Sequence, residues 1–337
     1  MNALTVAAVP MVELWRGWML ESTHLGHAVI CDAGGAVVAA WGDPAVTVYP
    51  RSSAKMLQAL PLIESGAAAA AGLTERHLAF ACASHIGAGL HVYMAAEWLS
   101  GLGMGEADLR CGSHEPFDRA ERNRLIREGE APCQLHNNCS GKHSGFLTLN
   151  RHLKGGSEYV EADHPVQVAV KAAFEEVTGE ASPGFGIDGC SAPNFATSLT
   201  GLARAMGRFA GATDGGDARS KAMHRLTAAM AGHPELVAGE GGACTELMRA
   251  MGGRVAIKGG AEGVYVAILP EQKLGIALKI IDGSDRAKDA AVAALLVRAG
   301  VLDADHPATR AHLNAVVTNR RGIAVGVLRA ASGFPGH

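Results

Sequence analysis

Apolar and polar positions near the start of the chain follow the period of β-strands. Two β-rich runs, Val12–Leu20 and His27–Cys31, are followed by an Asp-Ala-Gly-Gly turn at 32–35 and a third run, Ala36–Trp41. Strands joined by so short a turn pair antiparallel, because a parallel crossover needs a dozen or more residues. The sequence therefore predicts an antiparallel β-structure for the first part of the chain.

The middle of the chain changes to a helical period. A helical stretch begins near Ser52, and its apolar residues recur at helical spacing: Met56, Leu57, Leu60 and Ile63. Loops rich in Gly, Pro, Cys and Asn are expected at 131–141 and 184–194. Between and around these loops we expect five further helices: Val92–Leu102, Asp118–Glu128, Val166–Val177, Phe195–Met206 and Asp217–Ala231.

The β-pattern returns toward the C-terminus. Val264–Leu269 and Leu274–Ile281 flank a turn at 270–273, and a helix is expected at Arg286–Ala299. The tail after Asn319 receives no assignment.

Strands at both ends of a helical middle predict an α+β fold. We expect one antiparallel sheet built from about residues 1–50 and 255–337, with a mostly helical region at about 51–254. No internal repeat or linker-like run divides the chain, so residues 1–337 are expected to form a single unit.

Composition narrows the classes of function. Of 337 residues, 48% are apolar, and 30 basic residues against 33 acidic ones give a net charge of -3. The basic patch of a nucleic-acid-binding protein is missing. No apolar run reaches the roughly 18 residues that span a bilayer, so no membrane association is expected. The segment at 1–15 has no positive n-region and is expected to begin the fold rather than to be a signal peptide. Seven cysteines, an odd number, favour reduced thiols in the cytoplasm.

The first candidate for chemistry is a Ser-x-x-Lys motif made by Ser52 and Lys55. Three residues apart at a helix start, the two side chains share one face. A serine hydroxyl needs a nearby base to act as a nucleophile, and a lysine serves if burial or neighbouring cations lower its pKa. The alternative is that Ser52 or Ser53 only caps the helix.

Two more short motifs follow in an order that favours a shared site. Ser84-His85 ends an apolar run before Gly87, and Lys258-Gly259-Gly260 precedes the strand at 264–269. The latter parallels the Lys-Thr-Gly strand motif of serine β-lactamases and penicillin-binding proteins, which also use Ser-x-x-Lys. Taken singly, the first could be a turn serine beside a satisfied histidine, and the second a polar approach to a hairpin.

The loop at 136–145 gathers several possible metal ligands, and Asp188-Gly189-Cys190 lies about fifty positions further on. Two thiolates with a carboxylate or an imidazole suit Zn²⁺. The spacing matches no standard zinc finger, because there is no second C-x-x-C. The alternative is two buried cysteines among loop polar groups that hold backbone carbonyls.

Four segments together resemble the bacterial asparaginase II family, the rhizobial-type L-asparaginases. They are Tyr-Pro-Arg-Ser-x-x-Lys at 49–55, Ala-Ser-His at 83–85, His-Asn-Asn-Cys-Ser-Gly-Lys-His at 136–143 and Gly-Ala-Glu-Gly-Val-Tyr at 260–265. The resemblance covers nearly the whole chain. It implies a serine β-lactamase and penicillin-binding-protein-like fold, a homodimer, and hydrolysis of L-asparagine to L-aspartate and ammonia.

The resemblance also implies roles for individual residues. It implies two serine–lysine pairs, Ser52 with Lys55 and Ser84 with Lys258. It implies a zinc ion near the substrate, and the motif positions of its ligands are Cys139, Lys142 and Cys190. Asp188 would reach the ion through water, and Arg51, His143 and Asp188 are the candidate substrate-binding residues.

The chain departs from the family pattern in two places, and both changes remove charge. Ser84-His85 is followed by Ile-Gly-Ala-Gly at 86–89 in place of a Glu-Pro segment, and the stretch at 239–245 lacks an arginine and an aspartate. The leading hypothesis is an asparaginase. Hydrolysis of a β-lactam or ester on the same fold, and a non-catalytic protein that binds zinc or asparagine, remain as alternatives.

Overall fold

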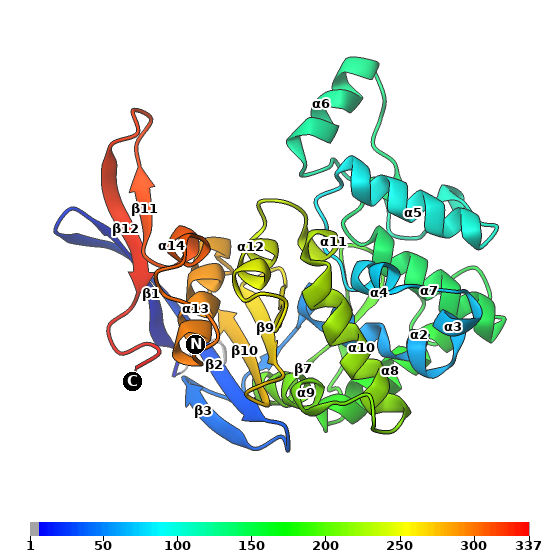
Figure 1. Cartoon of the computed structure of the whole chain (residues 1–337), viewed down its shortest axis with the longest axis horizontal. Coiled ribbons are helices and arrows are strands. Elements are labelled where there is room, and N and C mark those ends of the chain that lie inside the picture. Colours follow the sequence, from blue (N-terminus) through cyan, green and yellow to red (C-terminus); the bar gives the residue numbers. More distant parts are fainter. Residues whose placement is uncertain (1–6, 337) are drawn as a thin grey trace.

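An antiparallel sheet joins the two ends of the chain. The computed structural model describes residues 7–336, and residues 1–6 of the segment expected to begin the fold lie outside them. The main strand order is β11-β12-β1-β2-β10-β9-β8, with β3 also paired to β2 (Figure 1). The strands are β1 Val9–Arg16, β2 Met19–Asp32, β3 Val37–Trp41, β8 Ala256–Gly259, β9 Val264–Leu269, β10 Leu274–Ile280, β11 Ala315–Thr318 and β12 Ala324–Ala330.

Strand β2 holds the two ends of the chain together. It pairs with β1 and β3 from the N-terminal part and with β10 from the C-terminal part, where Ala28 lies opposite Leu278. Every one of these pairings is antiparallel. The predicted α+β class, with one sheet assembled from both ends of the chain, is therefore confirmed.

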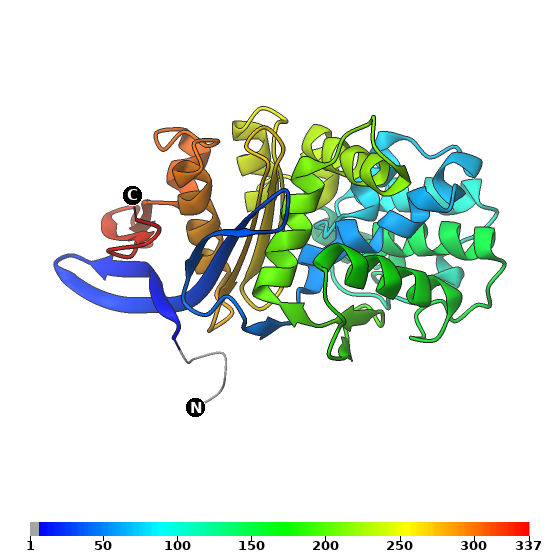
Figure 2. The ribbon, with the colours of Figure 1, turned by 90° about the horizontal axis from the view of Figure 1, so that it is seen from below.

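Helices from the middle of the chain form a body beside the sheet (Figures 1 and 2). Helix α9 packs on β2 and β10, whereas α13 packs on the other face against β9, β10, β1 and β12. The helices are η1 Arg51–Ala54, α1 Lys55–Gln58, α2 Leu60–Glu64, α3 Ala67–Ala70, α4 Glu75–Ala81, α5 Gly89–Gly101, η2 Glu106–Asp108, α6 Arg119–Glu128, η3 Gln134–His136, α7 Ser140–Leu153, α8 Pro165–Thr178, α9 Leu199–Gly211, α10 Ala218–Gly232, α11 Pro234–Ala238, α12 Ala243–Ala250, α13 Asp285–Arg298 and α14 Pro307–His312.

Short strands replace the first part of one predicted helix. The helix expected at Phe195–Met206 begins only at Leu199, because the Ser198 side chain caps it by accepting a hydrogen bond from the Gly201 N–H. The residues before it form the small strands β6 and β7, which pair with β5 and β4. These strands are β4 Thr47–Val48, β5 Phe185–Ile187, β6 Pro193–Phe195 and β7 Thr197–Ser198.

The predicted loop at 131–141 ends earlier than expected, since α7 begins at Ser140. The serines and glycines of this segment are typical of a loop, but residues 140–150 are all buried, and packing outweighs that local preference. The stretch after Ser52 is also broken: a 3-10 turn is followed by α1, and α2 restarts with Pro61 in its first turn. The other predicted helices lie within about three residues of their expected bounds.

Two further observations concern the whole of the described chain. Within residues 7–336 no helix has both the length and the apolar character needed to cross a membrane. All seven cysteines are free thiols, and six of them are buried.

Helix α9 approaches the sheet closely enough that only glycine fits at the contact. A Cβ atom on Gly275 of β10 would lie 2.0 Å from the Gly207 backbone nitrogen of α9, and one on Gly207 would lie 2.2 Å from the Asp32 carbonyl oxygen. These atoms belong to backbone and cannot turn aside. The close contact fixes the distance between the sheet and the helical body.

We therefore predict that Gly275→Ala lowers the free energy of unfolding by about 3 kcal/mol, because an added methyl group must push two backbones apart. Urea unfolding followed by circular dichroism measures this loss. Gly101→Ala is the matched control, because a Cβ there meets nothing within 4 Å. Equal stability of the two variants would contradict the close contact.

Candidate active site

The ammonium of Lys55 lies among the short motifs identified in the sequence, with 1% of the residue exposed. Its Nζ donates hydrogen bonds to the Ala83 carbonyl, to Ser84 Oγ at 3.0 Å and to Cys139 Sγ at 3.1 Å. Three acceptors match the three N–H donors of an ammonium. Lys55 therefore joins the segment at 83–84 to the loop that carries Cys139.

Ser52 lies in the 3-10 turn η1, one turn before Lys55. Its side chain is half-buried, and within residues 7–336 its hydroxyl makes no hydrogen bond. The neighbouring Ser53 hydroxyl donates to the Pro50 carbonyl at 2.7 Å. Neither η1 nor α1 has a side-chain cap, so the interpretation of Ser52 or Ser53 as a simple helix cap does not hold.

Strand β8 brings Lys258 to the same place. Gly260 passes so close to η1 that a Cβ on it would lie 2.7 Å from the Pro50 oxygen and 3.2 Å from the Ser53 nitrogen. Burial, together with the charges of Lys55 and Lys288, lowers the pKa of Lys258 to about 8. The Lys258 ammonium donates to the Gly259 carbonyl at 2.8 Å.

A cluster of sulfur and nitrogen atoms adjoins Lys55 on its other side. Lys142 Nζ donates to Cys190 Sγ at 2.9 Å. The pKa of the Cys190 thiol is held well below its usual range by a hydrogen bond from Cys139, and the charge of Lys142 adds to this. Burial opposes the charge of Lys142, but Cys190 and Cys139 together raise its pKa. Cys190 is thus the thiolate of the cluster, and Lys142 is its counter-ion.

His143 completes the cluster from the next position of α7. Its Nδ1 hydrogen-bonds to the Tyr159 hydroxyl at 2.8 Å. Its Nε2 is buried without a well-formed hydrogen bond and lies toward Cys190. Burial, together with the charges of Lys142 and Lys55, lowers the pKa of His143, so the imidazole is neutral at pH 7.

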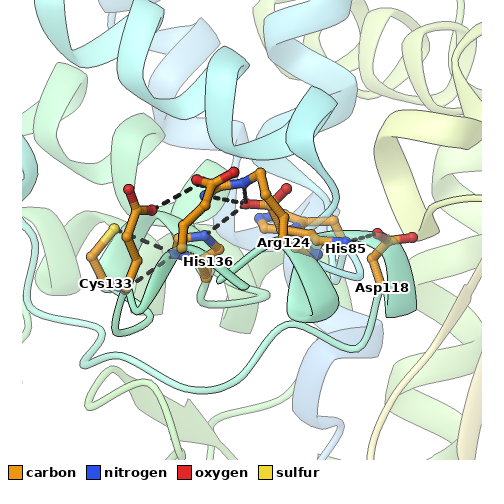
Figure 3. Close-up of polar contacts among 9 residues, drawn as sticks. His85, Asp118, Arg124, Cys133 and His136 are labelled. Carbon is orange, nitrogen blue, oxygen red and sulfur yellow. Dashed lines mark hydrogen bonds and ion pairs between the residues drawn. The ribbon is translucent and has the colours of Figure 1, made fainter. Parts of the chain in front are cut away.

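The loop before α7 is held by a polar network shown in Figure 3. The Cys133 N–H donates to His136 Nδ1 at 3.1 Å, so this ring carries its proton on Nε2, which faces the Glu121 carboxylate at 3.3 Å. Arg124 binds the same carboxylate. These contacts fix the backbone that leads to Cys139.

His85 secures the other side of the same loop. Its backbone N–H donates to the Asn138 carbonyl at 3.2 Å, and its ring Nε2 hydrogen-bonds to Ser140 Oγ at 2.9 Å. Burial lowers its pKa well below the usual value. His85 is thus a neutral ring that ties the Ser84 segment to the start of α7.

Arg51 and Asp188 form an ion pair at the edge of the site. The guanidinium donates to Asp188 Oδ1 from Nε at 3.1 Å and from Nη2 at 2.9 Å. Arg51 has a φ of 53°, a left-handed conformation that is rare for residues with a side chain, and its N–H donates to Asn194 Oδ1. The strained backbone turns the guanidinium toward the residue that precedes Gly189-Cys190.

The structure brings the ten candidate residues to one region but links some of them differently from the implied pairs. Lys55 contacts Ser84, and within residues 7–336 no hydrogen bond joins Ser52 Oγ to Lys55 Nζ or Ser84 to Lys258.

Other residues at the site carried no signal in the sequence. Tyr159 binds His143, Asn194 holds the Arg51 backbone, and Lys288 donates to the Gly260 carbonyl at 3.1 Å. Cys244 Sγ accepts a hydrogen bond from the Gly259 N–H and contacts the Tyr265 hydroxyl. These partners lie too far apart in the sequence for any spacing rule to find them.

The zinc ion expected from the sequence would have to use the sulfur and nitrogen atoms of this cluster. Within residues 7–336 no three His, Cys, Asp or Glu side chains gather in a way that could hold a metal. A zinc site here would therefore need Lys142 to lose its proton and to bind as a neutral amine beside Cys139 and Cys190. The two sulfurs and the Lys142 nitrogen are donors of the kind that Zn²⁺ prefers. The buried Nε2 of His143, which has no hydrogen bond in the described part of the chain, is a further nitrogen beside them.

Comparisons with known proteins give one family and several distant structures. Residues 12–330 match the family model described as L-asparaginase II. No curated protein is significantly similar in sequence. A β-lactamase from Mycobacterium bovis is similar in structure, at 14% identity over 81% of this chain and 94% of that chain, with a TM-score of 0.47. Mglu in its tris and glutamate form is similar at 13% identity over 83% of this chain and 61% of its own, with a TM-score of 0.45.

Proposed function

The chain belongs to the L-asparaginase II family, and we propose that it hydrolyses L-asparagine to L-aspartate and ammonia through an acyl-enzyme on Ser52. The observation that carries this proposal is the buried arrangement of Lys55, Ser84 and Lys258 beside the free hydroxyl of Ser52. A serine hydroxyl becomes a nucleophile when a neutral amine nearby can accept its proton.

The first half of the reaction forms an ester. Ser52 Oγ attacks the side-chain amide carbon, and its proton passes to the lysine pair, directly or through Ser84. The same proton is delivered to the amide nitrogen, the C–N bond breaks, and ammonia leaves. Ser84 and the charge of Lys55 stabilise the negative oxygen that develops on the tetrahedral carbon.

The second half regenerates the serine. Water adds to the ester carbon and gives a proton to the neutral lysine. The bond to Ser52 Oγ then breaks, and the serine takes the proton back as L-aspartate is released. Because one lysine both accepts and returns the proton, each cycle leaves the enzyme in its starting protonation state.

Charges at the edge of the site suit the two ends of an amino acid. Asp188 offers a carboxylate for an ammonium group, and Arg51 offers a guanidinium for a carboxylate. In our proposal Cys139, Lys142 and Cys190 hold a zinc ion, with Asp188 reaching it through water. The ion would supply a positive charge that orients the substrate, and His143 would lie beside it. We further propose that the protein is a cytoplasmic homodimer. Its free thiols, six of them buried, fit a reducing compartment such as the cytoplasm.

We predict that Ser52→Ala lowers the rate of ammonia release from L-asparagine by about three orders of magnitude or more, because the nucleophile is lost. Circular dichroism and size-exclusion chromatography should show an unchanged fold and dimer. Ser84→Ala is the informative partner, expected to retain measurable turnover and a covalent ester on Ser52. Ser52→Ala activity within tenfold of wild type would rule out Ser52 as the nucleophile.

The same assay separates the alternatives. Turnover of the β-lactam nitrocefin without ammonia release from asparagine would favour β-lactam hydrolysis. Saturable asparagine binding without ammonia release would favour a non-catalytic binding protein.

For the metal, we predict up to one zinc per chain in protein purified without chelators, lost in Cys139→Ala and in Cys190→Ala. KM for asparagine should rise in these variants more than kcat falls, since the ion is assigned to orient the substrate. Elemental analysis gives the zinc content independently of activity, and Cys111→Ala, a buried thiol outside the cluster, is the control. A zinc-free wild-type protein would overturn this part of the proposal.

The pH profile should follow Lys258. Its pKa is lowered to about 8, so the neutral amine that can accept a proton becomes more abundant as pH rises through 8. We predict that kcat/KM increases about tenfold between pH 7 and pH 9. Lys258→Arg should not restore activity, because a guanidinium stays protonated in this range. Lys279→Gln, at another largely buried lysine on β10, should leave the rising limb in place.

A profile flat from pH 5 to pH 10, or a fully active Lys258→Arg variant, would contradict this assignment. The base would then be another group such as His85 or His143.

A further inference from the structure

A cavity of about 400 Å³ lies away from the serine–lysine site, between the C-terminal helices and the end of the sheet. Its lining residues come from helices α13 and α14 on one side and from strands β1, β11 and β12 on the other. Figure 1 shows where these elements lie in the fold. Its volume falls within the range of small-molecule sites in proteins. Its lining residues are Leu14, Arg286, Asp289, Ala311, His312, Ala315, Val317 and Leu328.

Two charged side chains of opposite sign line this cavity without pairing. Arg286 and Asp289 are three residues apart on α13, so they leave the helix on one face about 5–6 Å apart. Arg286 donates only to His24 Nε2 at 3.2 Å and to Ser22 Oγ at 3.3 Å. Within residues 7–336 Asp289 makes no hydrogen bond or ion pair, although most charged side chains that lose water gain a partner.

The neighbours of Asp289 do not neutralise its carboxylate. Burial raises its pKa to about 6, and the groups that face it are Lys288 and Asp285 from α13, His312 from α14 and Glu246 from α12. Lys288 is already engaged with Asp285 and the Gly260 carbonyl, and His312 with Glu246 at 2.8 Å. Within residues 7–336 the Asp289 carboxylate therefore makes no ion pair. The exposed Arg286 guanidinium is near the carboxylates of Glu21 and Asp282 but forms an ion pair with neither of them.

The remaining wall of the cavity is apolar. Leu14, Val317 and Leu328 come from three neighbouring strands, and two alanines complete the surface. A ligand that satisfies the whole lining carries an ammonium group, a carboxylate and an aliphatic group close together. We propose that this cavity is an accessory binding site for an α-amino acid with an aliphatic side chain, held by Asp289 at its ammonium and by Arg286 at its carboxylate.

The site is separate from the one assigned to asparagine, and its existence does not depend on that assignment. It shares α13 with Lys288, whose ammonium holds the carbonyl of Gly260 two residues after Lys258. A bound amino acid therefore contacts the helix that supports the catalytic strand.

Saturation-transfer NMR with L-leucine as the probe tests the proposal on the full-length protein. Wild type should bind L-leucine saturably, and 3-methylbutylamine and 4-methylpentanoate, which each lack one charge, should bind at least about tenfold more weakly. Asp289→Asn and Arg286→Met should each weaken L-leucine binding by about tenfold or more. Asp285→Asn, one turn earlier on α13 and outside the cavity lining, should bind as wild type does.

Ala315→Phe provides a second route, because a phenyl ring from β11 would occupy space in the cavity while both charged side chains are kept. This variant should lose L-leucine binding and keep its thermal unfolding midpoint within a few degrees of wild type. The proposal is overturned if wild type shows no saturable binding, or if the amine alone binds as well as L-leucine. It is also overturned if both Asp289→Asn and Ala315→Phe retain wild-type affinity.

Discussion

A buried ammonium needs an acceptor for each of its N–H groups, and around Lys55 this need ties three parts of the chain together. Removing a charge from water costs several kcal/mol unless hydrogen bonds replace the lost hydration. Lys55 finds its acceptors at Ala83, Ser84 and Cys139. Lys55 is consequently shared between the candidate serine–lysine site and the sulfur cluster. A substitution at Ser84 or at Cys139 removes one of its acceptors and thereby alters its position in the other group.

The charges around Lys55 suit a small zwitterion. Arg51 pairs with Asp188, and Lys142 pairs with the Cys190 thiolate, so each cation at the edge already has an anion. Lys258 makes no ion pair within residues 7–336, and burial, together with the charges of Lys55 and Lys288, lowers its pKa. In the proposed mechanism the paired charges at the edge would recognise the substrate, and the amine of Lys258 would accept the proton.

Local periodicity predicted β3, β9, β10 and most helices, because alternation and helical spacing are properties of short segments. It missed the turn between β1 and β2, which lies within the run expected at 12–20, and it did not predict β8, β11 or β12. It failed at α7, where small polar residues typical of a loop are buried in a helix that carries Lys142 and His143. At the candidate site, short motifs identified residues that the fold brings into one region, since each motif lies beside a turn or a glycine. The hydrogen bond from Lys55 to Ser84 and the partners Tyr159 and Asn194 depend on packing between distant segments, which no spacing rule contains.

The pairing of β2 with β10 has a consequence for synthesis on the ribosome. Asp32 pairs with Leu274, so the first long strand leaves the exit tunnel more than two hundred residues before its partner. Until then β2 has only its own hairpins, and for most of that time helix α9, which packs on β2, has not been translated either. Folding therefore depends on contacts of long sequence separation, which are slow to form and leave strand edges exposed to aggregation. The nascent chain needs protection until its last third has been translated.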